Sequence, residues 1–414
     1  MTVRPTDLAL SPYRVLDLTG ESGWLCGRLL GDLGADVIKI EPPGGDPGRR
    51  HGPFYDGQVN SERSLTWFAL NFNKRGITLN IQTADGRALF RRLAATADFV
   101  IESFPPGCME TLGLGYSSLR STNPRLVMTS ITPFGQTGPY WDYKADDLVA
   151  LAMGGLMAIT GDPDRAPLRV GVPLAYFVGA SHAAAGTMIA HYQRQRTGRG
   201  KHVDVSVQEA VVDTLQKTSQ TWYVEGKVHP RGGREYGGRM MRDIHRARDG
   251  CVHFQVHWGP GPGKSAQALA EWMRSVGYKA DYAERELTRL TDRDVTQEQI
   301  DRWQREIEGF FGLFTKRQLY AEALKRRIIL FPVDSPEDIE ANEQLAARSF
   351  FHEVYHPDLR ASLRYPGPLG RFSACPTAIY RPAPLIGQHN DEVYGQELGY
   401  APEELVSLKE AGVV

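Results

Sequence analysis

Cysteines are scarce in this sequence, and their spacing argues against two kinds of site. The 414 residues include four cysteines, none of them in a CxxC or CxxH pair: Cys26, Cys108, Cys251 and Cys375. Structural zinc sites and disulfide frameworks are built from closely spaced cysteines. The pattern therefore predicts a protein of the reducing cytoplasm that holds no metal.

An excess of charge and a long apolar run are lacking as well. The 48 Lys and Arg residues face 49 Asp and Glu residues, so the formal net charge is −1. This balance gives no overall attraction to nucleic acid or to an anionic membrane. No run approaches the roughly 18 apolar residues that span a bilayer, and the N-terminus lacks the apolar core of a signal peptide. We expect a soluble, cytoplasmic protein without nucleic-acid or membrane partners.

Three common catalytic and nucleotide-binding motifs are missing. No GxGxxG follows the first expected strand, so the dinucleotide fingerprint of a dehydrogenase is absent. Residues 258–265 resemble a phosphate-binding loop, but Trp258 replaces its first glycine and two prolines remove amide donors. There is no GxSxG elbow. Ser181 and His182 are sequence neighbours whose side chains diverge on a helix, so they do not form a nucleophile–base pair.

Short β-rich runs alternate with helical periods through the first half of the chain. The expected strands include 14–18, 35–40, 77–81, 99–101 and 126–131, and the expected helices include 22–33, 85–97 and 174–196. Such alternation predicts a largely parallel sheet that is covered by helices on both faces. The predicted fold class is α/β, of the open type related to doubly wound sheets.

The second half of the chain differs in character. A length of 414 residues exceeds one ordinary core and suggests two domains. Residues 225–335 combine a strand pair with charged helices, which indicates a smaller second domain. After Pro332 the chain is rich in proline and is expected to be extended, so it can wrap across a neighbouring domain or subunit.

A basic pair precedes the strand expected at 77–81. Lys74 and Arg75 follow Asn73 in a loop-like stretch. In isolation, such a pair is typical of a solvated surface. The alternative is a phosphate clamp, because lysine and arginine beside a loop can hold a diphosphate.

Several segments together carry a resemblance to one family. They are RVLDL at 14–18, GDLGADVIKIEPPGGDP at 31–47, NKRG at 73–76, FGQTGPY at 134–140 and RPAPLIGQH at 381–389. In this order they resemble the class III coenzyme A transferases, which include formyl-CoA transferase, carnitine CoA-transferase and the related α-methylacyl-CoA racemases. The resemblance extends from the first strand to the C-terminus.

The resemblance implies an architecture and a binding site. A large Rossmann-like domain would contain residues 1–220 and the returning segment 336–414, with a smaller α/β domain inserted at 225–335. Two subunits would thread through each other as an interlocked dimer, with coenzyme A between large and small domains. Asp147 matches an acidic residue near the reacting centre. The residues expected to bind CoA are Phe72, Lys74, Arg75, Ser103, Phe104 and Lys144.

The sequence departs from the family pattern at positions that carry the nucleophile or bind CoA. Tyr176 stands where these enzymes carry their aspartate nucleophile, and an ordinary phenol is only about one part in a thousand ionised at pH 7. Thr111 replaces an arginine that helps to hold CoA, and Ser103 replaces an asparagine. Racemase relatives need a His and an Asp, and the helix opening at Asp146 and Asp147 lacks the histidine.

The resemblance implies transfer of CoA from an acyl-CoA donor to a carboxylic acid, with no metal. Tyr176 leaves three hypotheses open. The chain is a non-catalytic subunit paired with a related chain that bears the aspartate, as in the two-subunit family member that activates benzylsuccinate. Alternatively, it is an active homodimer that uses a non-Asp mechanism. In the third hypothesis it binds CoA or acyl-CoA without turnover.

Overall fold

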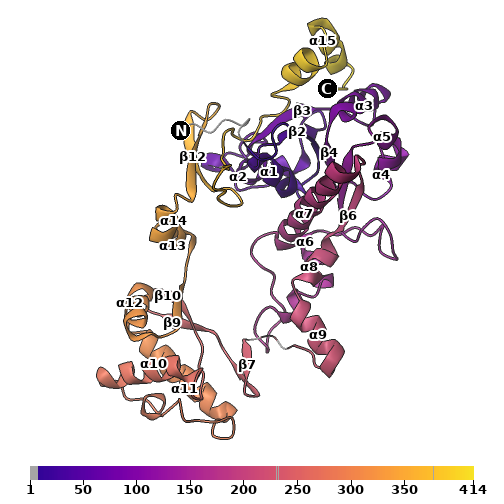
Figure 1. The fold of residues 1–414 in the computed structure, drawn as a ribbon. Helices are drawn as coiled ribbons and strands as arrows, with labels where there is room; N and C mark the ends of the chain where they lie inside the picture. Colours follow the sequence, from indigo (N-terminus) through magenta and orange to yellow (C-terminus); the bar gives the residue numbers. More distant parts are fainter. Residues whose placement is uncertain (1–7, 230, 232, 376) are drawn as a thin grey trace. The chain divides into compact units, whose positions relative to one another are not determined.

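The structure is a computed structural model that describes residues 8–229, 231, 233–375 and 377–414. Its internal contacts divide the chain into two compact units. The first unit comprises Met1–Met157, Arg169–Val224 and Ala347–Val414, and the second comprises Ala158–Leu168 and Glu225–Ala346. Figure 1 colours these segments by their position along the chain.

A six-stranded parallel sheet lies at the centre of the first unit, and it confirms the expected α/β class. The strand order is β3-β2-β1-β4-β5-β6, and each neighbouring pair is parallel. The chain moves outward from β1 to β3 and then returns to place β4 beside β1. Open sheets of this kind bind ligands at the carboxyl ends of the strands where the order reverses. The strands are β1 Arg14–Leu18, β2 Asp36–Glu41, β3 Lys74–Thr78, β4 Phe99–Glu102, β5 Val127–Thr132 and β6 His202–Ser206.

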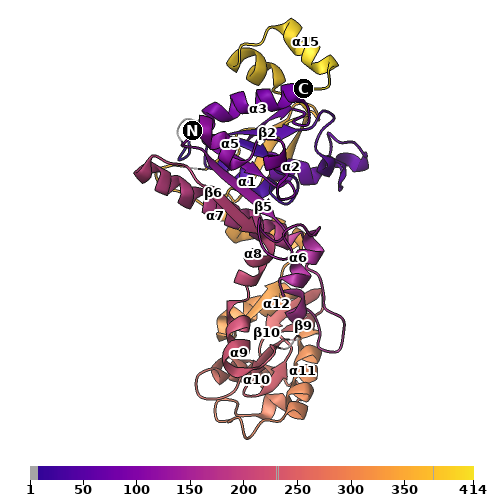
Figure 2. The same ribbon diagram turned by 90° about the vertical axis from the view of Figure 1, so that its right-hand side faces the viewer.

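Helices cover both faces of this sheet, because successive strand residues point to opposite sides. Val15 packs on the side of Leu30 and Ala183, whereas its neighbour Leu16 packs on the side of Leu89. The two helical layers can be followed in Figures 1 and 2. The helices up to residue 225 are α1 Trp24–Asp32, α2 Leu65–Asn71, α3 Ala84–Thr96, α4 Cys108–Thr111, α5 Tyr116–Thr122, α6 Asp147–Met153, α7 Leu174–Thr197, α8 Val207–Asp213 and α9 Gln216–Glu225.

Helix α7 lies close to the sheet because its buried residues are small. Ala175, Ala180 and Ala183 are buried, and a Cβ at Gly179 would lie 3.0 Å from Val207. The helix ends at Gly198, whose φ of +70° is accessible to glycine at little cost. Although α7 has 24 residues, none of the described helices is long and apolar enough to cross a membrane.

The second unit has its own sheet and its own core. Strands β11, β10 and β9 form an antiparallel sheet, and Trp272, Trp303 and Phe310 lie in its apolar cluster. Its elements include β7 Arg234–Tyr236, β8 Arg239–Met241, β9 Ile244–Ala247, β10 Gly250–Phe254, α10 Gly263–Ser275, α11 Gln297–Phe311, α12 Lys316–Arg326, β11 Leu330–Val333, α13 Pro336–Glu340 and α14 Glu343–Ala347.

Strand β3 begins at Lys74, three residues before the strand expected at 77–81. The interpretation of Lys74 and Arg75 as loop residues on a solvated surface is therefore wrong, since Lys74 is fully buried and Arg75 is 5% exposed. A charged residue is tolerated here because Lys74 Nζ donates to Asp17 Oδ2 at 2.8 Å. It also donates to the Trp24 carbonyl at 2.9 Å and to Asn71 Oδ1 at 2.8 Å.

The C-terminal segment packs against the N-terminal half of the first unit. It contains the hairpin β12 Phe351–His356 and β13 Ala361–Pro366, a π-helical stretch Asp391–Glu397 and α15 Pro402–Glu410. Arg75 Nη1 donates to Glu392 and Glu397, and the amide of His389 donates to the Gly76 carbonyl at 2.9 Å. Segments about 300 residues apart in sequence therefore share one core.

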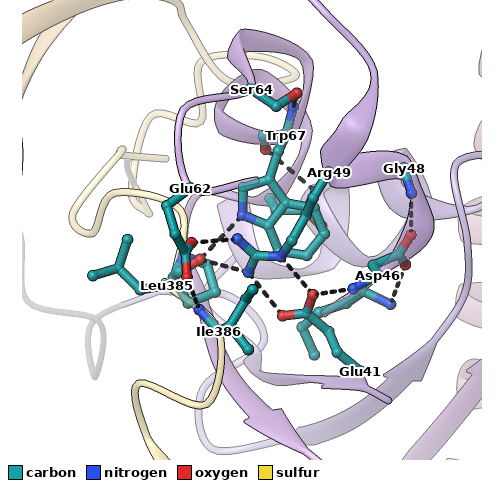
Figure 3. A network of polar contacts seen from close by, with 12 residues as sticks. Glu41, Asp46, Gly48, Arg49, Glu62, Ser64, Trp67, Leu385 and Ile386 are labelled. Atoms are coloured by element: carbon teal, nitrogen blue, oxygen red, sulfur yellow. Dashed lines mark hydrogen bonds and ion pairs between the residues drawn. The ribbon is translucent and has the colours of Figure 1, made fainter. Parts of the chain in front are cut away.

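Buried Arg49 is the centre of a network that joins three segments (Figure 3). Its guanidinium donates two hydrogen bonds to Glu41, at 2.6 and 2.8 Å, and one to Glu62 at 2.8 Å. It also donates to the Pro384 carbonyl at 2.9 Å and stacks 3.7 Å from the Trp67 ring centroid. The network ties the loop after β2 to α2 and to the C-terminal segment.

We expect Arg49→Met to lower the free energy of unfolding by about 3–5 kcal/mol, because Glu41 would keep a buried charge without a partner. Urea unfolding followed by circular dichroism measures the loss. Exposed Arg50 offers a matched control, and Arg50→Met should change stability by less than about 0.5 kcal/mol. Equal effects of the two substitutions would contradict the importance of the Arg49 network.

Candidate functional site

Two adjoining cavities open at the carboxyl ends of β1, β4 and β5, where the strand order reverses. The larger, of about 470 Å³, is lined by residues that follow β1, β2 and β3. The smaller, of about 270 Å³, is lined by residues that follow β4 and β5 and by the start of α7. Ser103 and Phe104 line both cavities. An extended ligand that passes this shared wall can occupy both cavities.

Tyr176 lies in the first turn of α7 and lines the smaller cavity. Burial, together with the carboxylates of Glu21 and Asp146, raises the pKa of its phenol to about 12, against the hydrogen bond from the backbone of Asp147. With that pKa, only about one phenol in 100,000 is ionised at pH 7. Tyr176 is therefore protonated under physiological conditions and cannot act as an anionic nucleophile.

Asp147 lies beneath Tyr176, at the start of α6. It is 6% exposed, and its Oδ1 accepts the N–H of Ala175 at 2.9 Å. Its Oδ2 lies 3.8 Å from Arg169 Nε and has no hydrogen-bond partner among the described residues. Burial raises the pKa of Asp147 against these contacts. The carboxylate thus anchors the N-terminus of α7, where the backbone amides of a helix need acceptors.

The structure brings together Tyr176 and three of the residues expected to bind CoA. Ser103, Phe104 and Lys144 line the smaller cavity with Tyr176. Ser103 Oγ also accepts the N–H of Gly20 at 2.8 Å, which joins the loops after β1 and β4. Lys144 is exposed, so its ammonium is available to an anionic ligand.

The other three expected CoA contacts lie away from both cavities. Phe72 is buried with the Arg28 guanidinium 4.2 Å from its ring centroid. Lys74 and Arg75 are engaged in the internal ion pairs described above. CoA contact by these three residues stays a prediction. Thr111, at the end of α4, donates its hydroxyl to the carbonyl of Gly107, the residue before that helix.

Several cavity residues escaped the sequence reasoning. Glu21, Lys39, Asn80 and Gln82 line the larger cavity, and His51 Nδ1 lies 3.1 Å from Glu21 Oε2. All of these residues except Lys39 follow the carboxyl end of a strand of the sheet. Residues in such positions line the binding site where the strand order reverses, and this is the signal that could have identified them. That rule finds them only once the strand order is known.

Lys39 is buried among acidic residues at the back of the larger cavity. Its Nζ lies 3.5 Å from Asp46 and 4.0 Å from Asp17, and it donates to the Thr19 carbonyl. In the described part of the chain, no group of three or more His, Cys, Asp or Glu side chains is placed to hold a metal ion.

Comparison with known proteins identifies the family. The sequence model of CoA-transferase family III matches residues 10–390. The chain belongs to this family. The resemblance to class III CoA-transferases is thereby confirmed.

The relatives of this family III chain match almost its whole length. Subunit BbsE of succinyl-CoA:(R)-benzylsuccinate CoA-transferase from Thauera aromatica is 34% identical, with 98% of each chain covered. Succinyl-CoA–D-citramalate CoA-transferase from Chloroflexus aurantiacus is 33% identical with the same coverage. The crystal structure of a CAIB/BAIF family protein from Brucella suis has a TM-score of 0.83 and 28% identity, covering 94% of this chain and 99% of that one.

Asp147→Ala should lower the free energy of unfolding by about 1–2 kcal/mol, because the Ala175 amide at the start of α7 loses its acceptor. Asp147→Asn keeps an acceptor oxygen and should cost less. Chemical denaturation measures both, with exposed Asp142 on the same cavity as the matched control. A loss no larger than that of Asp142→Ala would contradict the anchoring role.

Proposed function

We propose that this chain is a subunit of a class III CoA-transferase that lacks its own nucleophile and is paired with an Asp-bearing paralogue. The complete enzyme transfers CoA from an acyl-CoA donor to a carboxylic acid. One observation carries the proposal: Tyr176, which the resemblance assigns to the position of the family's aspartate, lies in surroundings that keep its phenol protonated. A carboxylate can attack a thioester and form a mixed anhydride, whereas a neutral phenol is a poor nucleophile.

The two joined cavities support binding of a CoA thioester by this chain. CoA is long, with a nucleotide at one end and a thioester at the other, and both cavities share the Ser103–Phe104 wall. We place the thioester beside Tyr176 in the smaller cavity and the nucleotide toward Asn80 and Gln82 in the larger one. The exposed ammonium of Lys144 is positioned to meet an anionic group of the substrate.

The surface of the first unit supports assembly with a second subunit. Large apolar side chains are exposed on α6, α8 and α9, among them Leu148, Met153, Val212, Trp222 and Tyr223. Apolar surface of this extent is typical of a face that another protein covers. Two relatives are named as subunits, BbsE and the alpha subunit of succinyl-CoA–L-malate CoA-transferase.

These features lead us to propose an interlocked dimer in which 225–335 is the inserted domain and 336–414 returns to a Rossmann-like large domain. In such an arrangement a chain without the nucleophile still completes its partner's fold. We also propose a cytoplasmic location for the complex.

The alternative is an active homodimer that uses another nucleophile, and one observation favours it. Glu21 lines the larger cavity and acts electrostatically on Tyr176. It is a carboxylate, the chemical type that the family reaction requires. Under this alternative, Glu21→Gln would abolish transfer by the isolated chain.

The isolated chain should show no exchange of CoA between succinyl-CoA and added carboxylic acids, because it has no nucleophile at position 176. Co-expression with an Asp-bearing relative should restore the exchange. Trapping with hydroxylamine tests for an acyl-enzyme, and mass spectrometry identifies the chain that carries it. Full activity and an acyl adduct on the isolated chain would overturn the pseudo-catalytic role.

Tyr176→Asp should convert the isolated chain into one that forms a hydroxylamine-sensitive acyl adduct, because it places a carboxylate in the smaller cavity. Tyr143 lines the same cavity, so Tyr143→Asp is the matched control and should form no adduct. Tyr176→Phe should leave the activity of the co-expressed complex within about twofold. A strong loss in Tyr176→Phe would show that the phenol takes part in the reaction.

A further inference from the structure

A line of polar groups crosses three neighbouring strands beneath the wall that the two cavities share. Glu102 ends β4, is 3% exposed, and its Oε2 accepts the backbone N–H of Phe104 at 2.7 Å. Ser130 on β5 is paired with Glu102 in the sheet and hydrogen-bonds to its carboxyl group. Ser130 Oγ lies 2.9 Å from Nε2 of His202 at the exposed start of β6. The line leads from solvent to the Phe104 amide.

The surroundings of Glu102 make its protonation sensitive to physiological pH. Burial raises the pKa of its carboxyl group to about 7, and the carboxylates of Glu110 on α4 and Asp204 on β6 act in the same direction. The hydrogen bonds from Ser130 and the Phe104 amide oppose the increase. Two other titratable groups face this region, Cys108 on α4 and His202 on β6.

We propose that Glu102 is a positioning residue that holds the Ser103–Phe104 wall for CoA, and that binding of CoA weakens as a proton reaches Glu102 through His202 and Ser130. This inference rests on the proposed function, since it takes the cavities as the CoA site. The ionised carboxylate makes a charge-assisted hydrogen bond to the Phe104 amide, which is stronger than a bond to a neutral acceptor.

The sign of the effect follows from the protonation state. Above about pH 7 the carboxylate is ionised and holds the Phe104 amide firmly. Below that pH the carboxyl group is neutral, the hydrogen bond weakens, and the wall is held less well. CoA affinity is therefore expected to fall between pH 8 and pH 6.

The Phe104 amide can be observed directly, without any ligand. The chain has 16 phenylalanines, so selective ¹⁵N-Phe labelling gives a spectrum simple enough to assign by substitution. In the wild type, the Phe104 amide shift should titrate with a midpoint near pH 7. In Glu102→Gln it should not change between pH 6 and pH 8. Ser130→Ala should move the midpoint to higher pH, because it removes a hydrogen bond that favours the carboxylate. A pH-independent Phe104 amide in the wild type would overturn the proposal.

Calorimetry with free CoA tests the consequence for binding. Wild-type Kd should be about three- to tenfold higher at pH 6 than at pH 8, whereas Glu102→Gln should bind equally at both pH values. Glu102→Ala should bind weakly at both. Glu110→Gln removes an exposed carboxylate that raises the pKa of Glu102, so it should keep a pH dependence whose midpoint lies at lower pH than in the wild type.

The two measurements separate this inference from the proposed function. Equal CoA affinity of the wild type at both pH values would overturn the pH dependence. A lack of CoA binding at either pH would overturn the proposed CoA site and the effect on affinity. In that case the amide titration still decides whether Glu102 positions the wall.

Discussion

The buried ion pair of Lys74 and Asp17 underlies the binding face of the first unit. Asp17 lies in β1 and Lys74 in β3, and their 2.8 Å contact is fully buried. Asp17 Oδ1 also accepts the N–H and the hydroxyl of Thr19, which directs the loop that carries Glu21 into the larger cavity. A Cβ at Gly27 would lie 2.2 Å from the Asp17 carboxylate, so only glycine fits there. Loss of either charge would leave the other buried without a partner, a change that typically costs about 3–5 kcal/mol.

Burial and neighbouring charges also determine the protonation of Tyr176. The site places three carboxylates, Glu21, Asp146 and Asp147, around a half-buried phenol, and the charges of all three raise its pKa. An aspartate nucleophile would also be made more basic by such neighbours. The family membership and the paired cavities are evidence about binding of a CoA thioester. The protonation of Tyr176 is evidence about whether this chain can supply the nucleophile. Under the proposed function, this chain keeps a CoA site while its partner supplies the nucleophile.

Much of the fold was predictable because it follows local periodicity. The alternation of apolar runs with helical periods predicted the parallel sheet and the helix at 174–196. The beginning of β3 was not predictable, because Lys74 and Arg75 are typical of a surface until Asp17 and Asp36 are placed beside them. Asp147 was expected near the reacting centre, and only the structure shows that it accepts the N–H of Ala175 at the start of α7.

The sequence by itself determined the family and the α/β class, because both depend on residue identity and order. The tertiary structure decided which residues share a cavity. Ser103, Phe104 and Lys144 meet Tyr176, while Phe72 and Lys74 are buried elsewhere. It also decided the protonation of Tyr176 and Glu102, since a pKa depends on burial and on neighbours from distant parts of the chain. The order of the strands in the sheet brings those neighbours together, and this order cannot be read from the local sequence pattern.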